Sequence, residues 1–239
     1  MERKLGKLVG LSAFFPAYNE EGNILSMCSS LTNALPQIAD DYEIIVVNDG
    51  SKDRTGEFAN RLAQNDNRIR VIHHEDNFGY GAAIRSGLCA SRMEYIFFTD
   101  GDNQFDVSQL SPFVSDIYGF DGVIGFRTNR QDPWVRKLNA WAWNQLVRLL
   151  FGLRVKDIDC AFKLFHRRVF KGLQLESSGA MISTEMLVKI KAEGFKLLER
   201  GVIHSPRVAG KQTGANLQVI LRAFKELFRF YNKFKGEKR

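Results

Sequence analysis

Short apolar runs that each end in a polar loop, and that alternate with helical stretches, constrain the fold of this chain most strongly. In the first hundred residues the runs cover 9–15, 42–47, 69–73 and 95–99. Helical stretches of about ten to fifteen residues between such runs are typical of βαβ units, in which parallel strands form a sheet covered by helices. We therefore predict an α/β domain. Because open α/β sheets bind ligands at the carboxyl ends of their strands, the polar loops mark the candidate site.

The same loops are predicted to start the helices. Asn19 is a good N-cap for a helix that runs to about residue 35, and Ser51 or Asp53 would cap a second helix that ends near residue 64. Beyond residue 120 the pattern predicts strands at 121–126, 161–165 and 195–203. Further helices are expected across the segment that carries the three tryptophans, from residue 183, and from about residue 217.

The loop after the fourth run carries two carboxylates and an amide, at Asp100, Asp102 and Gln104. If the chain stays extended, positions i, i+2 and i+4 project to one side. Hard oxygen ligands at a strand end suit Mg²⁺ or Mn²⁺, which completes its shell with water and phosphate oxygens. Gly101 would let a ligand approach the backbone closely. The alternative is an acidic turn that caps the next helix.

The charge of the chain favours an anionic partner. Its 239 residues carry a net charge of +7, with a sequence pI near 9.4. From residue 217 onward, apolar residues recur at spacings of three and four, with seven lysines and arginines against two glutamates. A basic amphipathic helix of this kind is typical of membrane-surface binding. The alternative is a terminal helix that docks on the core and leaves its basic face in water.

Several other functions and locations are disfavoured. The Gly79-x-Gly81 stretch continues with Ile84 where a dinucleotide site needs a small residue, and no Walker motif occurs. The positive charge does not accompany a motif that reads RNA or DNA, so no nucleic-acid partner is expected. No apolar run approaches the 18 or so residues of a membrane span, and the N-terminus reads as a strand, not as a signal peptide. Three scattered cysteines fit a reducing compartment. We expect a cytoplasmic protein, soluble or peripheral on the membrane.

Four motifs, in order on successive strand ends, resemble those of the family 2 glycosyltransferases of the GT-A fold. They are Pro16-Ala17-Tyr18-Asn19-Glu20, Asn48-Asp49-Gly50-Ser51-x-Asp53, Asn77-x-Gly79-x-Gly81 and Asp100-x-Asp102-x-Gln104. The likeness covers roughly residues 8 to 210. In the second half, further motifs resemble the dolichyl- and polyprenyl-phosphate sugar synthases: Gly125-x-Arg127, the 130–136 loop, Asp157-x-Asp159 and His204-x-Pro206-Arg207-x-x-Gly210. That family moves a sugar from a nucleotide sugar onto a lipid phosphate, usually with inversion.

The resemblance implies a Rossmann-like, mostly parallel sheet flanked by helices, in a catalytic domain over 1–212, followed by a basic amphipathic helix over 213–239. It implies a GDP-mannose or UDP-hexose donor, Mg²⁺ or Mn²⁺, a polyprenyl phosphate acceptor and an anionic membrane surface at the cytoplasmic face. Many relatives carry transmembrane helices after the catalytic domain, so an integral-membrane partner is a further expectation.

The resemblance also implies roles for individual residues. Donor-binding residues would be Pro16, Ala17, Tyr18, Glu20, Asp49, Asn77, Gly81, Asp100, Gly101, Asp102, Arg207 and Lys211. Asp100, Asp102 and Gln104 would hold the metal, and the acceptor phosphate would meet Arg127, Arg130 and Arg136. Asp49 would accept a hydrogen bond from the base or ribose. Asn48 departs from the family, since many relatives carry a second aspartate there, and this leaves the choice of base open.

The acceptor decides whether a general base is needed. A lipid monophosphate has a second pKa of about 6, so its oxygen is already anionic at neutral pH and needs cations to hold it, such as Arg127. A soluble family 2 transferase that acts on a saccharide hydroxyl would instead need a carboxylate base. Asp157, Asp159 and Glu185 are the candidates for that base, and the first two are favoured. The alternative for Asp157 and Asp159 is an acidic turn that pairs with Arg154 or Lys156.

Overall fold

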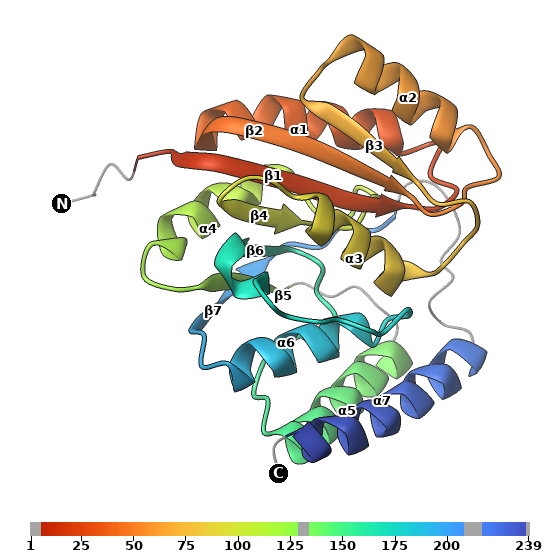
Figure 1. Ribbon diagram of the computed structural model, residues 1–239, viewed down its shortest axis with the longest axis vertical. Coiled ribbons are helices and arrows are strands. Elements are labelled where there is room, and N and C mark those ends of the chain that lie inside the picture. Colours follow the sequence, from red (N-terminus) through yellow and green to blue (C-terminus); the bar gives the residue numbers. More distant parts are fainter. Residues whose placement is uncertain (1–5, 129–133, 208–216, 238–239) are drawn as a thin grey trace.

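The computed structural model describes residues 6–128, 134–207 and 217–237. Within these residues, seven strands form one sheet in the order β3-β2-β1-β4-β6-β5-β7 (Figure 1). The strands are β1 (Leu8–Ala17), β2 (Ala39–Asn48), β3 (Ile69–His73), β4 (Tyr95–Phe98), β5 (Gly122–Arg127), β6 (Lys163–His166) and β7 (Leu197–Val202). Every predicted strand is found, with ends that differ from the prediction by at most three residues.

The sheet is mostly parallel, as predicted. β6 is antiparallel to both of its neighbours, β4 and β5, whereas β1 is parallel to β2 and β4, and β5 is parallel to β7. Every strand except β6 therefore runs in the same direction. As a result, the loops after β1, β2, β4, β5 and β7 all emerge at one edge of the sheet, where ligands of open α/β sheets bind.

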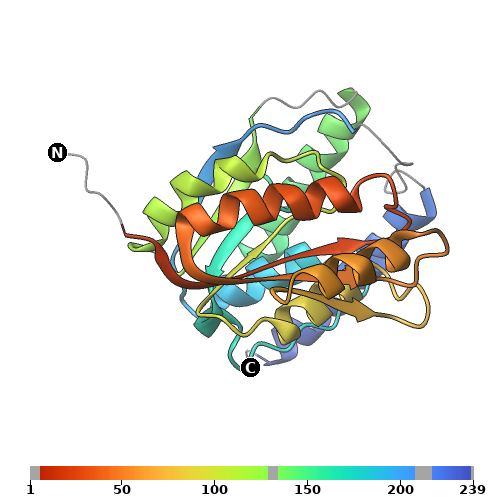
Figure 2. The same ribbon diagram turned by 90° about the horizontal axis from the view of Figure 1, so that it is seen from above.

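Helices cover both faces of the sheet (Figures 1 and 2). They are α1 (Ile24–Ile38), α2 (Thr55–Asn65), α3 (Tyr80–Ala90), α4 (Leu110–Ile117), α5 (Trp134–Phe151), α6 (Ile182–Ala192) and α7 (Leu217–Glu237). Side chains alternate between the faces of a strand: on β2, Ile44 and Val46 join the core beneath α1, α2 and α4, and Ile45 and Val47 join the core beneath α3 and α6. Short 3₁₀ turns precede α4 and follow β6.

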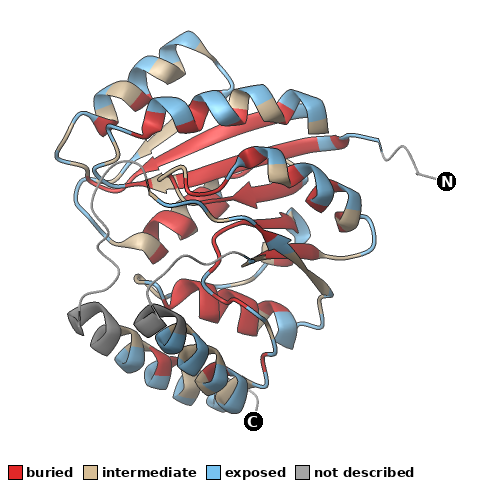
Figure 3. Ribbon diagram, turned by 180° about the vertical axis from the view of Figure 1, so that it is seen from behind, coloured by how far each residue is buried: buried red, intermediate tan, exposed pale blue. Residues whose placement is uncertain are grey.

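The helix α6 lies between the sheet and the pair formed by α5 and α7 (Figure 3). Most of it is buried, including the polar run Ser183, Thr184 and Glu185. α7 packs on α5 through aromatic rings, since the ring of Phe151 contacts those of Phe230, Tyr231 and Phe234. The apolar face of the terminal helix therefore docks on the core, the arrangement considered above as the alternative to membrane binding. Its basic residues Lys225 and Arg229 stay exposed. Among the described residues, no helix is both long enough and apolar enough to cross a membrane.

The predicted starts of the first two helices were too early, whereas those predicted from residue 183 and from about residue 217 were confirmed. α1 begins at Ile24, five residues after Asn19, and Asn19 has a left-handed backbone with φ of 55°. α2 begins at Thr55, and the Asp53 carboxylate accepts hydrogen bonds from the Thr55 amide and hydroxyl. These polar residues bind neighbouring loops or shape their own turn, so the helices begin only after those contacts are made.

Candidate active site

The loops after β1 and β2 are hydrogen-bonded to each other at the carboxyl edge. The amide of Asn19 donates to the Ser51 hydroxyl at 3.0 Å, and the Asn19 side chain accepts from the Lys52 amide at 2.9 Å. The Glu20 amide donates to the Thr55 hydroxyl at 2.8 Å. These contacts fix the predicted donor segment 16–20 as a rim, in which Ala17 is buried, Pro16 and Glu20 are half-buried and Tyr18 is exposed.

Asp49 organises this edge from inside. Its carboxylate is 3% exposed and accepts three hydrogen bonds, from His74 Nδ1 at 2.6 Å and from the amides of Phe78 and Gly79 at 3.0 and 2.9 Å. We expected Asp49 to accept a hydrogen bond from a base or ribose, but its surroundings favour a structural role. It holds the loop that contains the exposed Asn77.

Asn48 is also used internally, at the position where many relatives carry an aspartate. Its Nδ2 donates to His73 Nδ1 at 2.9 Å, and its Oδ1 accepts from the Ser51 amide at 3.2 Å. The other ring nitrogen of His73 lies 2.9 Å from Asn60 Oδ1. The asparagine at position 48 therefore stabilises the turn that follows β2.

The predicted metal loop after β4 does not stay extended. Residues 101–103 form a turn, with Asn103 in the left-handed region at φ of 58°, so the premise that three ligands project to one side of an extended chain was wrong. Gly101 is needed for another reason than expected. A Cβ there would lie 2.7 Å from the carbonyl oxygen of Pro16, so the close approach is made by β1 and not by a ligand.

The two carboxylates of this loop nevertheless interact. Burial and the neighbouring charge of Asp102 raise the pKa of Asp100 to about 7, and a hydrogen bond from the Tyr80 hydroxyl acts in the opposite direction. Two carboxylates that repel each other in a half-buried site fit a divalent cation, which would relieve the repulsion and accept hard oxygen ligands. Among the described residues, no group of three or more acidic, histidine or cysteine side chains forms a ready ligand set, either at this loop or elsewhere.

The loop after β7 brings Arg207 to these acids. The side-chain amide of Gln104 donates to the Ser205 backbone carbonyl at 2.9 Å, and the Ser205 backbone amide donates to the Gln104 backbone carbonyl at 2.8 Å. This pairing positions Arg207, whose guanidinium forms an ion pair with Glu20 and lies 3.7 Å from the Asp102 carboxylate. Three predicted donor-site residues from three different loops therefore meet. The side-chain nitrogen of Gln104 is committed to Ser205, whereas the side-chain oxygen is the atom predicted to bind the metal.

A second cluster follows β5. Arg127 and Asp157 form a two-pronged ion pair, with Nε at 2.7 Å and Nη2 at 2.8 Å from the carboxylate oxygens. The hydrogen bonds and charge of Asp157 outweigh the effect of burial and raise the pKa of Arg127 above its ordinary value. Asp157 therefore pairs with Arg127, and not with Arg154 or Lys156 as in the alternative above. The Nη1 atom of Arg127 makes no hydrogen bond within the described part of the chain.

A buried lysine beneath both clusters escaped the sequence analysis. Lys163 on β6 is fully buried, and its ammonium donates to the carbonyls of Ile158 and Cys160. Burial lowers its pKa, whereas the charges of Asp100, Asp157 and Asp159 act to raise it. The signal was present in the sequence, because a lysine inside the run Phe162-Lys163-Leu164-Phe165 must either break the strand or bury a charge. Asp159 itself is exposed at the same edge.

The start of α3 packs against a loop from the second half of the chain. The Gly81 amide donates to the Ser178 carbonyl at 2.8 Å, and a Cβ on Gly81 would collide with the carbonyl oxygens of Ser177 and Gly179. Gly81, predicted for donor binding, is thus needed for this contact. Tyr80, the first residue of α3 and the partner of Asp100, was missed because an aromatic residue at a helix start carries no distinctive sequence signal.

Glu185 does not fit the role of a general base. It is 1% exposed and accepts from the amides of Glu176 and Ser177 and from the Lys189 ammonium at 2.8 Å. These donors lower its pKa although burial would raise it. Arg130 and Lys211, two further predicted residues, lie outside the described residues, as does the side chain of Arg136.

Comparison with known proteins assigns the chain to a family. The family model described as glycosyl transferase family 2 matches residues 12–173. The chain is 34% identical to Glycosyltransferase AglD of Haloferax volcanii over 83% of its own length and 34% of that protein, and 29% identical to the polyprenol monophosphomannose synthase of Mycolicibacterium smegmatis over 85% of its length and 81% of that protein.

The fold has a counterpart among solved structures. Glucosyl-3-phosphoglycerate synthase from Mycobacterium tuberculosis, solved with Mg²⁺ and uridine diphosphate, superposes with a TM-score of 0.70 at 18% identity, over 96% of this chain and 81% of that one. The chain spans between about a third and three fifths of the length of several curated relatives, AglD among them. With the strand-end motifs, the sheet topology and the family match in agreement, this chain belongs to glycosyl transferase family 2.

Proposed function

We propose that this protein transfers a sugar from a nucleotide diphosphate sugar onto a polyprenyl phosphate, with inversion at the anomeric carbon. The observation that supports the proposal most is the meeting of two opposite chemistries at one sheet edge. The carboxylates Asp100 and Asp102, which repel each other, follow β4, and Arg127, whose Nη1 makes no hydrogen bond within the described residues, ends β5. A related protein with 81% of its length matched is a polyprenol monophosphomannose synthase.

The donor side uses the rim of β1 and the acids of β4. Asp100 and Asp102 would hold Mg²⁺ or Mn²⁺ on the donor diphosphate, where the ion would neutralise the charge that develops on the leaving group. Arg207 lies between Glu20 and Asp102 and would exchange these carboxylates for phosphate oxygens when the donor enters. The solved neighbour contains Mg²⁺ and uridine diphosphate, and its likeness to this chain is one of fold.

The acceptor side needs cations and not a base. A phosphate monoester is largely dianionic above about pH 6, so its oxygen can attack without losing a proton first. Asp157 holds Arg127 in a fixed orientation by two hydrogen bonds, and the remaining Nη1 would bind an acceptor phosphate oxygen. Orientation of the acceptor opposite the leaving group is then the main contribution of this cluster. Arg130 and Arg136 remain proposed partners of the same phosphate.

Transfer to a saccharide hydroxyl is the competing proposal, and it needs a carboxylate base. Asp157 is committed to Arg127, and Glu185 accepts from three donors, which leaves the exposed Asp159 as the candidate. The described helices include none able to span a membrane. We propose that contact with the lipid is made at the cytoplasmic face of the membrane by a peripheral protein.

The test is a transfer screen with Mn²⁺ that pairs UDP- and GDP-sugars with a short polyprenyl phosphate. We expect one donor to give a lipid-linked sugar in an amount that depends on the lipid phosphate. Donor binding without use of the lipid would favour the saccharide acceptor. Binding of no donor would contradict the proposed activity and leave the family assignment intact.

A further inference from the structure

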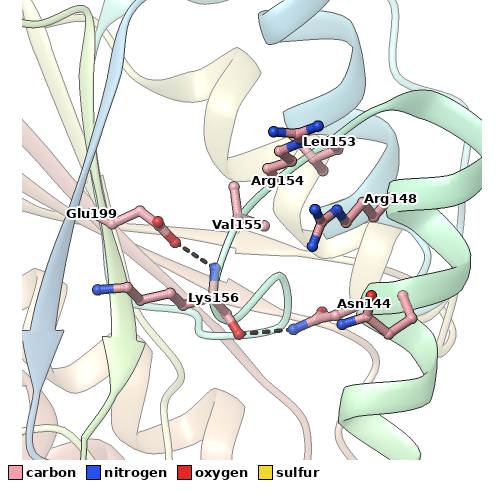
Figure 4. A pocket seen from close by; sticks show the side chains of 8 residues that line it. Asn144, Arg148, Leu153, Arg154, Val155, Lys156 and Glu199 are labelled. Carbon is pink, nitrogen blue, oxygen red and sulfur yellow. Dashed lines mark hydrogen bonds between the residues drawn. The ribbon is translucent and has the colours of Figure 1, made fainter.

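A basic pocket lies apart from the candidate site, at the carboxyl end of α5 (Figure 4). It has a volume of about 230 Å³ and is lined by α5, by the segment that follows it, and by β7. α5 ends at Phe151, and the amide of the next residue, Gly152, donates to the Arg148 carbonyl at 2.9 Å. The chain then turns back along the helix, so that Arg148 and Arg154 line the same pocket from its two walls.

The walls of this pocket are fixed by backbone hydrogen bonds. The Lys156 amide donates to the Glu199 carboxylate at 2.5 Å, and the Lys156 carbonyl accepts from the Asn144 side chain at 2.7 Å. The backbone N–H and C=O of Lys156 are thereby both hydrogen-bonded. Glu199, the one carboxylate among the described lining residues, accepts the first of these bonds. The Lys156 side chain extends away and places its ammonium 4.2 Å from the centre of the Phe126 ring. The pocket is therefore already formed in the absence of a ligand.

Its two arginines differ from most others in the chain. Arg148 and Arg154 have no ion pair and no side-chain hydrogen bond within the described residues. In Figure 4 the Arg148 guanidinium lies beside Val155, and the Arg154 guanidinium lies next to Leu153. Eight other described arginines pair with carboxylates, namely Arg54, Arg61, Arg68, Arg70, Arg127, Arg168, Arg200 and Arg207. Two like charges in one pocket are stabilised when an anion binds between them, and guanidinium forks match phosphate oxygens.

The surroundings of the pocket favour a lipid as the source of that phosphate. Residues 141, 145 and 148 share one face of α5 because helix neighbours recur at three and four residues. Trp141 on this face is 60% exposed, and Leu149 beside Arg148 is 82% exposed. Exposed tryptophan and leucine next to basic residues are typical of segments that lie in the interfacial region of a bilayer.

We propose that this pocket binds the phosphate of an anionic phospholipid headgroup and so docks the protein on the membrane. Glu199 in its wall pairs with Ile124 of β5, three residues before Arg127. At about 3.3 Å per residue, the pocket lies on the order of 10 Å from the proposed acceptor cation. A bilayer lipid held there would bring the membrane to the acceptor side of the sheet. The inference concerns binding alone, so it can fail or hold separately from the proposed transfer reaction.

The test measures binding of the full chain to phosphatidylcholine vesicles with and without about a third phosphatidylglycerol. Wild type is expected to prefer the anionic vesicles. The double variant Arg148→Gln/Arg154→Gln should bind them about 30-fold more weakly, because a basic side chain near an anionic leaflet contributes about fivefold. The control Lys171→Gln/Lys196→Gln removes the same charge from exposed lysines outside the pocket and should change binding by less than about threefold.

Two further measurements distinguish a lipid site from a site for soluble phosphate and from a loss of folding. Arg154→Gln alone, which leaves the helix untouched, should weaken vesicle binding about fivefold with an unchanged unfolding midpoint. Inorganic phosphate is titrated calorimetrically into wild type and the double variant. Loss of phosphate binding in the double variant with unaltered vesicle binding would assign the pocket to a soluble phosphate and overturn the lipid assignment. Equal losses in the double variant and the lysine control, or no loss in either, would overturn the site.

Discussion

The ion pair between Arg127 and Asp157 should contribute strongly to stability. Its two hydrogen bonds are 2.7 and 2.8 Å long, and the side chains are only 14% and 7% exposed. Removal of either side chain breaks this pair and leaves the other charge buried without its two-pronged partner, which costs about 3–5 kcal/mol. We therefore expect Asp157→Ala and Arg127→Ala each to lower the free energy of unfolding by about 3 kcal/mol or more. The double variant should lose about 2 kcal/mol less than the sum, because the second substitution removes the orphaned charge.

The assay is urea unfolding of the wild type, both single variants and the double variant, followed by tryptophan fluorescence. Comparison requires slopes that agree among the four proteins, since a changed slope signals a changed denatured or native state. The pair Arg54 and Glu57 is the control, because its side chains are 60% and 48% exposed and its coupling should be much smaller. Additive losses at Arg127 and Asp157 would refute the reasoning, since they would mean that neither side chain depends on the other.

Three further variants test other parts of the structure. Asp102→Asn should abolish sugar transfer in the presence of Mn²⁺ and leave the circular dichroism spectrum unchanged, and near wild-type turnover would contradict the metal assignment. Burial would raise the pKa of Glu43, but hydrogen bonds from its neighbours, Arg70 among them, hold it below the ordinary 4.5. The stability that Glu43 contributes is present above that value and is lost as the pH falls through the lowered pKa, so Glu43→Gln should destabilise most at neutral pH and the difference should shrink in acid; a constant difference in melting temperature would disprove this. Gly81→Ala should destabilise by about 1–3 kcal/mol in thermal unfolding, because its Cβ would meet carbonyls of the 177–179 loop; an unchanged midpoint would show that the loop moves freely.

Much of the fold could be predicted because several strands contain a short apolar run that ends in a polar loop. Runs such as 42–47 and 95–99 have the length and composition of buried strands and end in polar loops. The number of strands and their positions along the chain could therefore be predicted. The direction of β6 could not be predicted, because an apolar run carries no mark of whether its neighbours are parallel or antiparallel. The helix starts were misplaced because Asn19 and Asp53 have the side chains of good caps, and local pattern does not reveal that tertiary contacts between loops use them.

The sequence predicted which residues form the candidate site better than it predicted the contacts that these residues make. The motifs identified Asp100, Asp102, Arg127, Asp157 and Arg207, and the structure brings the two acids and Arg207 together and pairs Arg127 with Asp157. That polar groups such as Asp49 bind neighbouring backbone amides could not be predicted from spacing, since a carboxylate that binds a ligand and one that binds a backbone amide look the same in a sequence. Contacts between the halves of the chain, such as the support of the α3 start by residues 177–179, depend on the packing of α6 and were equally invisible.

The most direct test of the proposed reaction compares two acceptors that differ by one phosphate. The wild-type protein is assayed with the donor selected in the screen, Mn²⁺, and either a short polyprenyl phosphate or the corresponding polyprenol, and the organic phase is analysed for a lipid-linked sugar. The account predicts product from the phosphate and none from the alcohol, because Arg127 would hold a phosphate oxygen and the buried carboxylates Asp157 and Glu185 are engaged by cations. Comparable transfer to polyprenol, or transfer only to a saccharide, would contradict it.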